Sequence, residues 1–164
     1  MTTDRPLRIL LVDDEADLID FLSQRLLKRG WTVTATTDGE EALAAVRRQP
    51  FDVAVVDLRM PRMDGIELLE RIHAEKPYLA AIMLTGHGST ESALEAGRLG
   101  VVHYLIKPYD SDELIARIEE AALERESQLE AAYQEEMTRT IQPGATPTEI
   151  LEHGEELRRK YERD

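Results

Sequence analysis

The chain has 164 residues, of which 42% are hydrophobic, enough for one domain with a buried core and an appendage. Its 33 acidic and 20 basic residues give a formal net charge of −13, which disfavours direct binding to nucleic acid, because a phosphate backbone attracts a basic face. The absence of cysteine excludes disulfides, thiolate metal sites and thiol nucleophiles. We therefore expect a cytoplasmic protein.

No segment predicts export or membrane insertion. Residues 1–7 are polar and lack the apolar stretch of a signal peptide. The longest apolar runs, such as residues 9–12, are far shorter than the roughly 20 residues that a membrane-spanning helix needs. We expect neither a membrane partner nor secretion by these routes.

Short apolar runs alternate with longer amphipathic stretches between Arg8 and Lys107, which is typical of βα units on a parallel sheet. The first, third and fourth runs are continuously apolar, as strands covered on both faces must be. The second run alternates threonine with other residues and predicts an edge strand. The five expected strands are residues 8–12, 32–36, 52–56, 80–84 and 101–106.

Four segments between these strands predict helices. Gly30 and Pro50 suit the ends of the first two, and Asp64 is a suitable N-cap for the third. With right-handed crossovers, the pattern predicts an α/β fold with a doubly wound parallel sheet of order 2-1-3-4-5. Ligands then bind at the carboxyl ends of strands 1 and 3. The expected helices are residues 18–27, 41–48, 64–74 and 89–98.

A further helix is expected to begin with Ser111 as its N-cap and to keep an apolar stripe as far as Ile141. We assign residues 1–122 to the α/β domain and residues 123–164 to a helical C-terminal extension. This extension has no phosphate loop, metal motif or basic recognition helix, so it contains no recognised output domain.

Beyond the domain, the apolar stripe of this helix includes Leu129 and Tyr133, so another surface must shield it from water. A second copy would supply one, so we expect a homodimer with coiled-coil character through the extended fifth helix. After the break at residues 142–147, a short helix over residues 149–163 is expected to dock on its own domain or on a partner. Its expected apolar face is Ile150, Leu151, Leu157 and Tyr161.

Acidic residues follow two central strands of the predicted sheet. Asp13 and Asp14 follow the first strand, and Asp57 follows the third. Three converging carboxylates repel one another unless a cation is present or their pKa values rise. Mg²⁺ prefers such oxygens and leaves coordination positions for phosphate. The sequence therefore predicts a magnesium site suited to phosphoryl chemistry.

Asp57 is the candidate phosphoacceptor, because an ionised aspartate can act as a nucleophile and form an acyl phosphate. It lies in the middle of the predicted crevice, where Asp13 and Asp14 can hold the metal. Thr85 and Lys107 directly follow the fourth and fifth expected strands. We expect their hydroxyl and ammonium groups to donate to phosphoryl oxygens.

Four strings at these strand ends resemble, in order and spacing, the receiver domain of bacterial two-component response regulators. The resemblance covers roughly residues 7–122. The strings are LLVDDE (10–15), VVDLRMPRMDG (55–65), MLTGHG (83–88) and YLIKP (104–108).

The resemblance implies a flavodoxin-like fold and a partner, a sensor histidine kinase or phosphotransfer protein, whose phosphohistidine phosphorylates Asp57 in the presence of Mg²⁺. It also implies a cis bond before Pro108, and a switch pair, Thr85 and Tyr104, that signals through phosphorylation-dependent protein contacts. The implied metal ligands are the side chains of Asp14 and Asp57, the backbone carbonyl of Arg59, and Asp13 acting through a coordinated water.

Other functions stay open. The chain could be a dimeric scaffold of receiver fold that works without phosphorylation, or the truncated receiver of a larger transcription activator. A metal-dependent phosphohydrolase is disfavoured, because it needs a second acid/base aspartate where Arg59 stands. We expect a signalling protein and not an enzyme, apart from self-catalysed phosphotransfer and slow autodephosphorylation.

Overall fold

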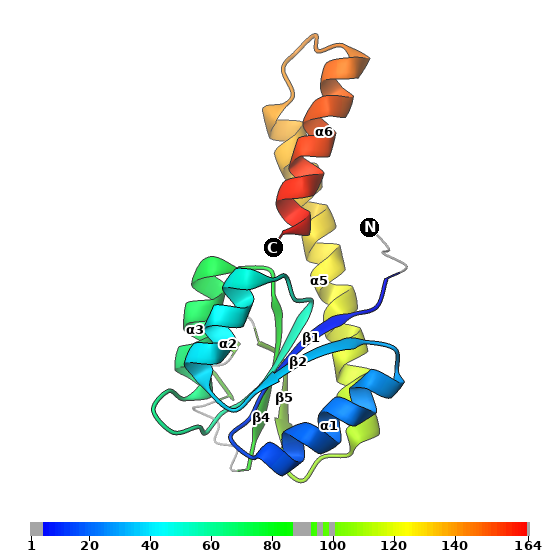
Figure 1. The fold of residues 1–164 in the computed structure, drawn as a ribbon. Coiled ribbons are helices and arrows are strands. Elements are labelled where there is room, and N and C mark those ends of the chain that lie inside the picture. Colours follow the sequence, from blue (N-terminus) through cyan, green and yellow to red (C-terminus); the bar gives the residue numbers. More distant parts are fainter. Residues whose placement is uncertain (1–4, 87–92, 95–96, 99–100, 164) are drawn as a thin grey trace.

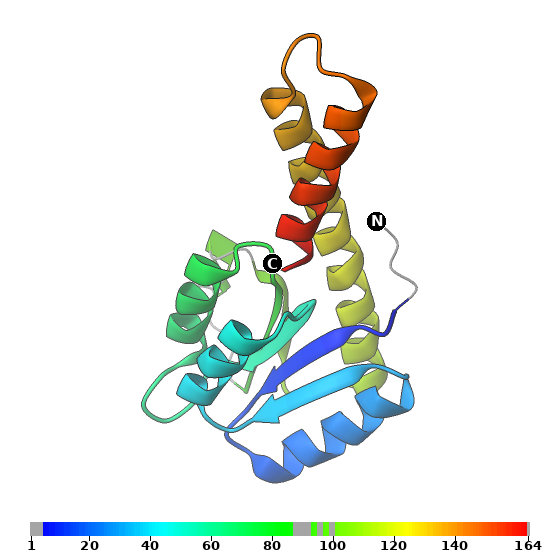
Figure 2. The ribbon, with the colours of Figure 1, turned by 45° about the horizontal axis from the view of Figure 1, so that its top comes forward.

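The structure is a computed structural model that describes residues 5–86, 93–94, 97–98 and 101–163. A parallel sheet lies between helices, and a long helical hairpin extends beyond one end of the sheet (Figures 1 and 2). The helix expected over residues 89–98 lies largely outside the described residues.

The sheet has the order β2-β1-β3-β4-β5 with every pairing parallel, which confirms the predicted doubly wound topology. The third strand begins one residue later than expected and includes Asp57 in place of Asp52. The strands are β1 (Arg8–Val12), β2 (Thr32–Thr36), β3 (Val53–Asp57), β4 (Ala80–Thr85) and β5 (Val101–Ile106).

Helices cover both faces of the sheet. One apolar cluster joins alternate residues of the central strands to α2 (Gly39–Arg48) and α3 (Gly65–Glu75). The other joins the opposite faces of these strands to α1 (Ala16–Lys28) and α5 (Ser111–Thr140). Coverage on both faces explains why β3 and β4 are buried along their whole length, whereas no described side chain of the edge strand β2 is fully buried.

Three aspartates cap helices that begin at the carboxyl edge of the sheet. Asp38 and Asp64 accept hydrogen bonds from backbone N–H groups at the starts of α2 and α3, which confirms the N-cap role expected for Asp64. The N-cap of α5 is Asp110, which accepts from the N–H of Asp112, so the assignment of this role to Ser111 was wrong. Ser111 is the first helical residue, and its hydroxyl accepts a hydrogen bond from Arg25 at 2.7 Å.

Helix α5 continues without a break beyond the sheet, and α6 (Pro147–Glu162) folds back beside it (Figures 1 and 2). Thr146 caps α6 through a reciprocal pair of hydrogen bonds with Glu149. The hairpin has its own apolar cluster, in which Leu129 and Tyr133 of α5 are buried with α6. The buried α6 residues are Gly154, Leu157 and Tyr161.

The apolar stripe of α5 is therefore covered within the same chain, so it does not need a second copy to bury it. Two of the four residues expected on the apolar face of α6, Leu157 and Tyr161, pack against α5. The prediction was wrong for the other two, Ile150 and Leu151, which are exposed. Tyr161 also reaches the α/β domain, where its ring meets Tyr78 edge to face with centroids 5.9 Å apart.

A buried ion-pair cluster joins α5 to the amino end of β3. The carboxylate of Asp52 is 3% exposed and accepts two hydrogen bonds of 2.8 Å from the guanidinium of Arg5. Arg8 contributes its backbone N–H and its guanidinium, and Arg125 of α5 lies 3.4 Å away. The pKa of Asp52 is far below its usual range: burial opposes the charged form, but the bonds from Arg5 and Arg8 outweigh it.

Within the described residues, no helix is both long enough and apolar enough to cross a membrane.

Candidate functional site

Asp13 and Asp14 directly follow β1, but their environments differ. Asp13 is completely buried, whereas Asp14 is exposed. One carboxylate oxygen of Asp13 accepts from the N–H of Glu15 at 3.0 Å, and the other accepts from Lys107 at 3.0 Å. Asp13 is therefore a fixed part of the framework, while Asp14 faces solvent.

Asp57 is the last residue of β3 and is 5% exposed. Its strand lies between β1 and β4, with Val56 beside Val12 and Asp57 beside Leu84. The next residue, Leu58, is held on both sides, because its N–H donates to the carbonyl of Leu84 at 2.7 Å and its carbonyl accepts from the N–H of Gly65 at 2.8 Å. The position of Asp57 is thus set by the backbone of neighbouring elements.

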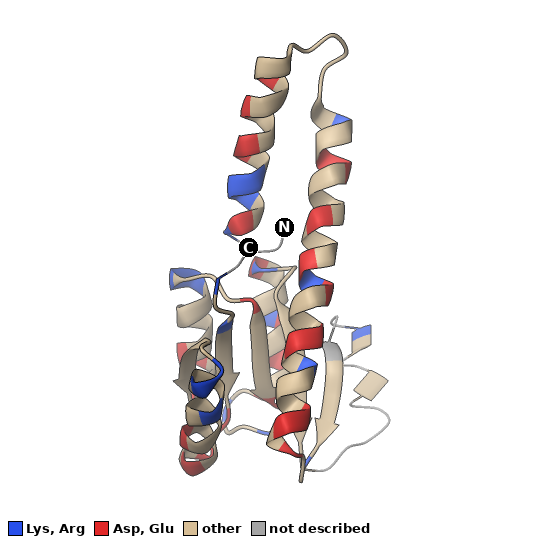
Figure 3. Ribbon diagram, turned by 90° about the vertical axis from the view of Figure 1, so that its right-hand side faces the viewer, with Lys and Arg blue, Asp and Glu red and all other residues tan. Residues whose placement is uncertain are grey.

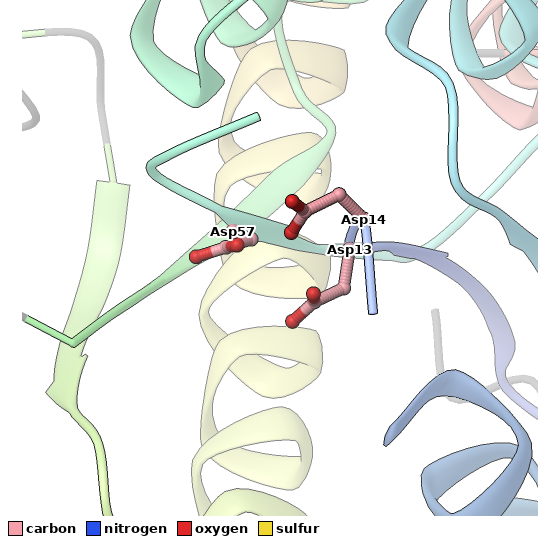
Figure 4. A group of neighbouring side chains, drawn as sticks. All are labelled: Asp13, Asp14 and Asp57. Atoms are coloured by element: carbon pink, nitrogen blue, oxygen red, sulfur yellow. The ribbon is translucent and has the colours of Figure 1, made fainter. Parts of the chain in front are cut away.

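The three carboxyl groups gather at the carboxyl ends of β1 and β3 (Figure 4). One oxygen from each of Asp13, Asp14 and Asp57 can be chosen so that all three atoms lie within 4.8 Å of one another. This arrangement of hard oxygen donors, two of them buried, fits a divalent cation such as Mg²⁺.

Lys107 follows β5 and brings an ammonium group to the same cluster. Its Nζ atom lies 3.0 Å from Oδ2 of Asp13, 3.6 Å from Oδ1 of Asp57 and 3.8 Å from Oε1 of Glu15. The Lys107 backbone is also fixed, because its N–H donates to the carbonyl of Thr85 at 2.6 Å. The peptide bond between Lys107 and Pro108 is cis.

Burial and the charges of Asp13 and Asp14 raise the pKa of Asp57 to about 6, although Lys107 and the N–H of Arg59 oppose this rise. The pKa of Lys107 is also raised: burial disfavours its charge, but the hydrogen bond to Asp13 and the nearby carboxylates outweigh that effect. The crevice therefore holds a cationic lysine beside a carboxyl group whose pKa is raised.

Thr85 and Tyr104 lie on β4 and β5. Thr85 is fully buried at the end of β4, and Tyr104 lies beside Met83 in the sheet register. Because side chains two residues apart share a face, Thr85 and Met83 point to the same side of the sheet. Tyr104 packs against the cluster that contains Met83, and its buried hydroxyl has no hydrogen-bond partner among the described residues.

The structure brings together Asp13, Asp14, Asp57 and Lys107. The backbone carbonyl of Thr85 accepts a hydrogen bond from the backbone N–H of Lys107. The side chain of Arg59 is exposed, and the contact that its backbone makes with Asp57 is a hydrogen bond from its N–H. The metal-binding role expected for its carbonyl stays a prediction.

Two residues near the site belong to the strings that carry the resemblance, but no role was expected for either. Glu15 lies within ion-pair distance of Lys107, and its place directly after the two aspartates was the available signal. Gly65 lies so close to the backbone of Asp57 that an added Cβ atom would be 2.3 Å from its carbonyl oxygen, and the available signals were its place in the VVDLRMPRMDG string and beside the capping residue Asp64. Neither signal indicates a contact across the fold.

Comparisons with known proteins give one consistent result. The family model described as "Response regulator receiver domain" matches residues 9–119. The Escherichia coli K12 transcriptional regulatory protein GlrR is 38% identical over 117 residues, which cover 71% of this chain and 26% of GlrR. FixJ, a transcriptional regulatory protein of Bradyrhizobium diazoefficiens, is 40% identical over 118 residues, covering 72% of this chain and 58% of FixJ.

Solved structures agree with these matches. A CheY-like receiver domain protein from Methanospirillum hungatei JF-1 has a TM-score of 0.72 and 33% identity, covering 75% of this chain and 98% of that one. A structure described as adenylate cyclase from Rhodopirellula baltica has a TM-score of 0.73 and 33% identity, and the match covers 83% of this chain and 99% of that one. The chain spans only about a quarter of GlrR and just over half of FixJ.

Proposed function

Because the chain belongs to the response regulator receiver domain family, we propose that Asp57 accepts a phosphoryl group from a sensor histidine kinase or a phosphotransfer protein. The observation that carries this proposal is the convergence of Asp13, Asp14 and Lys107 on the nearly buried carboxyl group of Asp57.

The proposed reaction is a displacement at phosphorus. A carboxylate oxygen of Asp57 bonds to phosphorus while the phosphorus–nitrogen bond of the donor phosphohistidine breaks. The departing imidazole keeps the electron pair of that bond and takes up a proton. Lys107 is close enough to Asp57 to donate a charge-assisted hydrogen bond to an oxygen of the transferred group. Thr85 is proposed as the second donor.

Asp13, Asp14 and Asp57 would hold the divalent cation, with Arg59 as the proposed source of a backbone oxygen. When bound, Mg²⁺ supplies positive charge that offsets the repulsion between the carboxylate and the phosphoryl oxygens. The same charge would favour ionisation of Asp57, whose pKa burial and the neighbouring carboxylates raise to about 6.

The signalling step is proposed to be a rearrangement of Thr85 and Tyr104. Movement of the Thr85 hydroxyl toward the phosphoryl group would change the space beside Tyr104, which carries a buried hydroxyl without a described partner. The altered surface would include β5 and the start of α5 and would change protein contacts.

We assign residues 1–122 to the receiver domain and residues 123–164 to an extension. The chain is proposed to act in the cytoplasm without a membrane partner and without direct contact to nucleic acid, and to have no enzymatic activity beyond its own phosphorylation and slow dephosphorylation. Its charge supports the absence of DNA contact, since acidic residues recur along the whole of α5 (Figure 3). Two alternatives stand beside this assignment: a phosphorylation-independent scaffold and the receiver part of a longer transcription activator.

The homodimer through α5 also stays a prediction, but its original reason is gone because α6 covers the apolar stripe. A dimer would have to use another face of α5 or exchange α6 between copies. Sedimentation velocity of the full chain tests this directly.

Binding of beryllofluoride, a mimic of the phosphoryl group, tests the proposed function. We expect a ¹⁹F resonance of bound beryllofluoride that requires Mg²⁺ and is lost in Asp57→Asn. The Asp14→Asn variant should need a higher Mg²⁺ concentration for the same signal. A folded wild-type chain that binds no beryllofluoride with Mg²⁺ present contradicts the proposal and favours the scaffold.

A further inference from the structure

Gly65 allows the first turn of α3 to lie against the backbone of the phosphoacceptor. A Cβ atom placed on Gly65 would lie 2.3 Å from the carbonyl oxygen of Asp57 and 3.0 Å from Cα of Leu58. Contacts of Cβ atoms below 3.0 Å essentially do not occur. Any other residue at this position must therefore move α3 or the end of β3 by at least about 0.7 Å.

This close approach differs in kind from the environments of the other glycines in the described part of the chain. A Cβ atom on Gly39 or Gly154 would meet a side-chain atom, Sδ of Met63 at 3.0 Å or the hydroxyl oxygen of Tyr133 at 3.1 Å. Positions such as Gly30 and Gly86 have open space around them. At Gly65 the obstructing atoms are backbone, which cannot rotate away.

The movement that a side chain would cause is directed at the site. On the β4 side, the end of β3 is fixed by the hydrogen bond of 2.7 Å from Leu58 to Leu84. On the α3 side, the N–H of Gly65 donates to the carbonyl of Leu58 at 2.8 Å. Leu58, the residue after Asp57, is thus held from both sides, so a shift forced at Gly65 acts on the end of β3 that carries the Asp57 carboxyl group.

We infer that Gly65 is a positioning residue for Asp57: the absence of a side chain at this position sets the distances among the phosphoacceptor, the carboxylates of β1 and Lys107. The inference rests on the proposed function. Phosphoryl transfer depends on such distances, and a misplacement of about 1 Å can lower a rate by about a hundredfold. A displacement near 0.7 Å is therefore large enough to matter for the reaction.

The test compares Gly65→Ala with wild type and with Gly30→Ala. Gly30 has φ +82°, so alanine there destabilises the fold through backbone strain, but it lies after α1, away from the phosphoacceptor. The rate of phosphorylation by acetyl phosphate and the affinity for Mg²⁺ are measured per folded molecule, with trimethylamine N-oxide added where a variant needs it. The amide resonance of Leu58 reports movement of the end of β3.

We expect Gly65→Ala to lower the phosphorylation rate by about tenfold to a hundredfold and to shift the Leu58 amide resonance. Gly30→Ala should keep the wild-type rate. Equal rates in Gly65→Ala and wild type overturn the inference, as does a Gly65→Ala chain that stays unfolded where Gly30→Ala folds, because the role is then only structural. Failure of the wild type itself to react contradicts the proposed function instead, so the two failures are distinguishable.

Discussion

The ammonium group of Lys107 donates a hydrogen bond to the buried carboxylate of Asp13 at 3.0 Å. This contact joins the two outer sides of the site, since Asp13 follows β1 and Lys107 follows β5. It also holds the ammonium group of Lys107 3.6 Å from Oδ1 of Asp57, the proposed phosphoacceptor. The same cation counteracts part of the rise in the pKa of Asp57.

Replacing Lys107 with methionine should raise the pKa of Asp57 further above its value of about 6, because the substitution removes a favourable charge and keeps the burial and the charge of Asp13. A pH titration of the ¹³C resonance of the Asp57 carboxyl group, without Mg²⁺, measures the change. Lys76→Met is the matched control, because Lys76 donates to the carbonyl of Arg163 near the end of α6. An unchanged or lower pKa of Asp57 in Lys107→Met would show that the lysine does not act on it.

Asp57→Asn should stabilise the metal-free protein at pH 7. The folded-state pKa of about 6 exceeds the ordinary value of 3.8, so the folded protein binds more protons than the unfolded chain between these values. Stability supplied by the neutral carboxyl group is therefore lost as the pH rises through 6. From the shift of about two units, the gain in Asp57→Asn is on the order of 1–3 kcal/mol at pH 7.

Urea denaturation with a chelator present measures this gain. The difference between Asp57→Asn and wild type should shrink below pH 4, where both side chains are neutral. Saturating Mg²⁺ should also reduce it, because the cation stabilises only the chain with the full carboxylate set. A variant less stable than wild type at pH 7 in chelator contradicts the electrostatic description of the site.

The topology and most of the site could be predicted because both depend on local patterns. Continuous apolar runs identified β1, β3 and β4, and acidic residues directly after two of these strands had to meet at one edge. The Ser111 N-cap was wrong because its neighbour Asp110 is an equally suitable capping residue, and sequence cannot rank the two.

Contacts between distant segments could not be predicted. Nothing local to Tyr78 or Tyr161 indicates that the α3–β4 loop meets the end of α6. From the sequence, we expect a second copy to bury Leu129 and Tyr133, whereas α6 of the same chain buries them. The apolar stripe alone does not distinguish a second copy from α6, because either could cover it. The return of α6 depends on the path of residues 141–146, where Gly144 has φ 87°.

Asp52→Asn should destabilise the fold by about 3 kcal/mol at pH 7, because it leaves Arg5, Arg8 and Arg125 around a neutral group. The folded-state pKa of Asp52 is depressed, so its contribution is present above the ordinary pKa and is lost as the pH falls below it. The difference from wild type in urea should therefore shrink below about pH 4. Glu75→Gln, which breaks an exposed pair with Arg47, is the control and should change stability little. A loss in Asp52→Asn as small as that in the control would contradict a structural role for the buried cluster.

Tyr161→Ala should loosen α6 while leaving the sheet intact. The substitution removes the ring contact with Tyr78 and the hydrogen bond of 2.6 Å to Glu136. A loss of about 1.4 kcal/mol or more from the hairpin would speed amide exchange over residues 147–163 by about tenfold or more. Hydrogen exchange with mass spectrometry measures it. Leu151→Ala, at a side chain that is 64% exposed, should leave the exchange unchanged. Equal exchange in the two variants would show that Tyr161 does not hold α6 in place.

The most direct test of the central claim is the intact mass of the protein after incubation with acetyl phosphate and Mg²⁺. Asp57 should gain one phosphoryl group, located by peptide mapping, and the adduct should be absent in Asp57→Asn and in wild type with a chelator. Unmodified, folded wild-type protein, or a phosphoryl group located on any residue other than Asp57, would contradict the account.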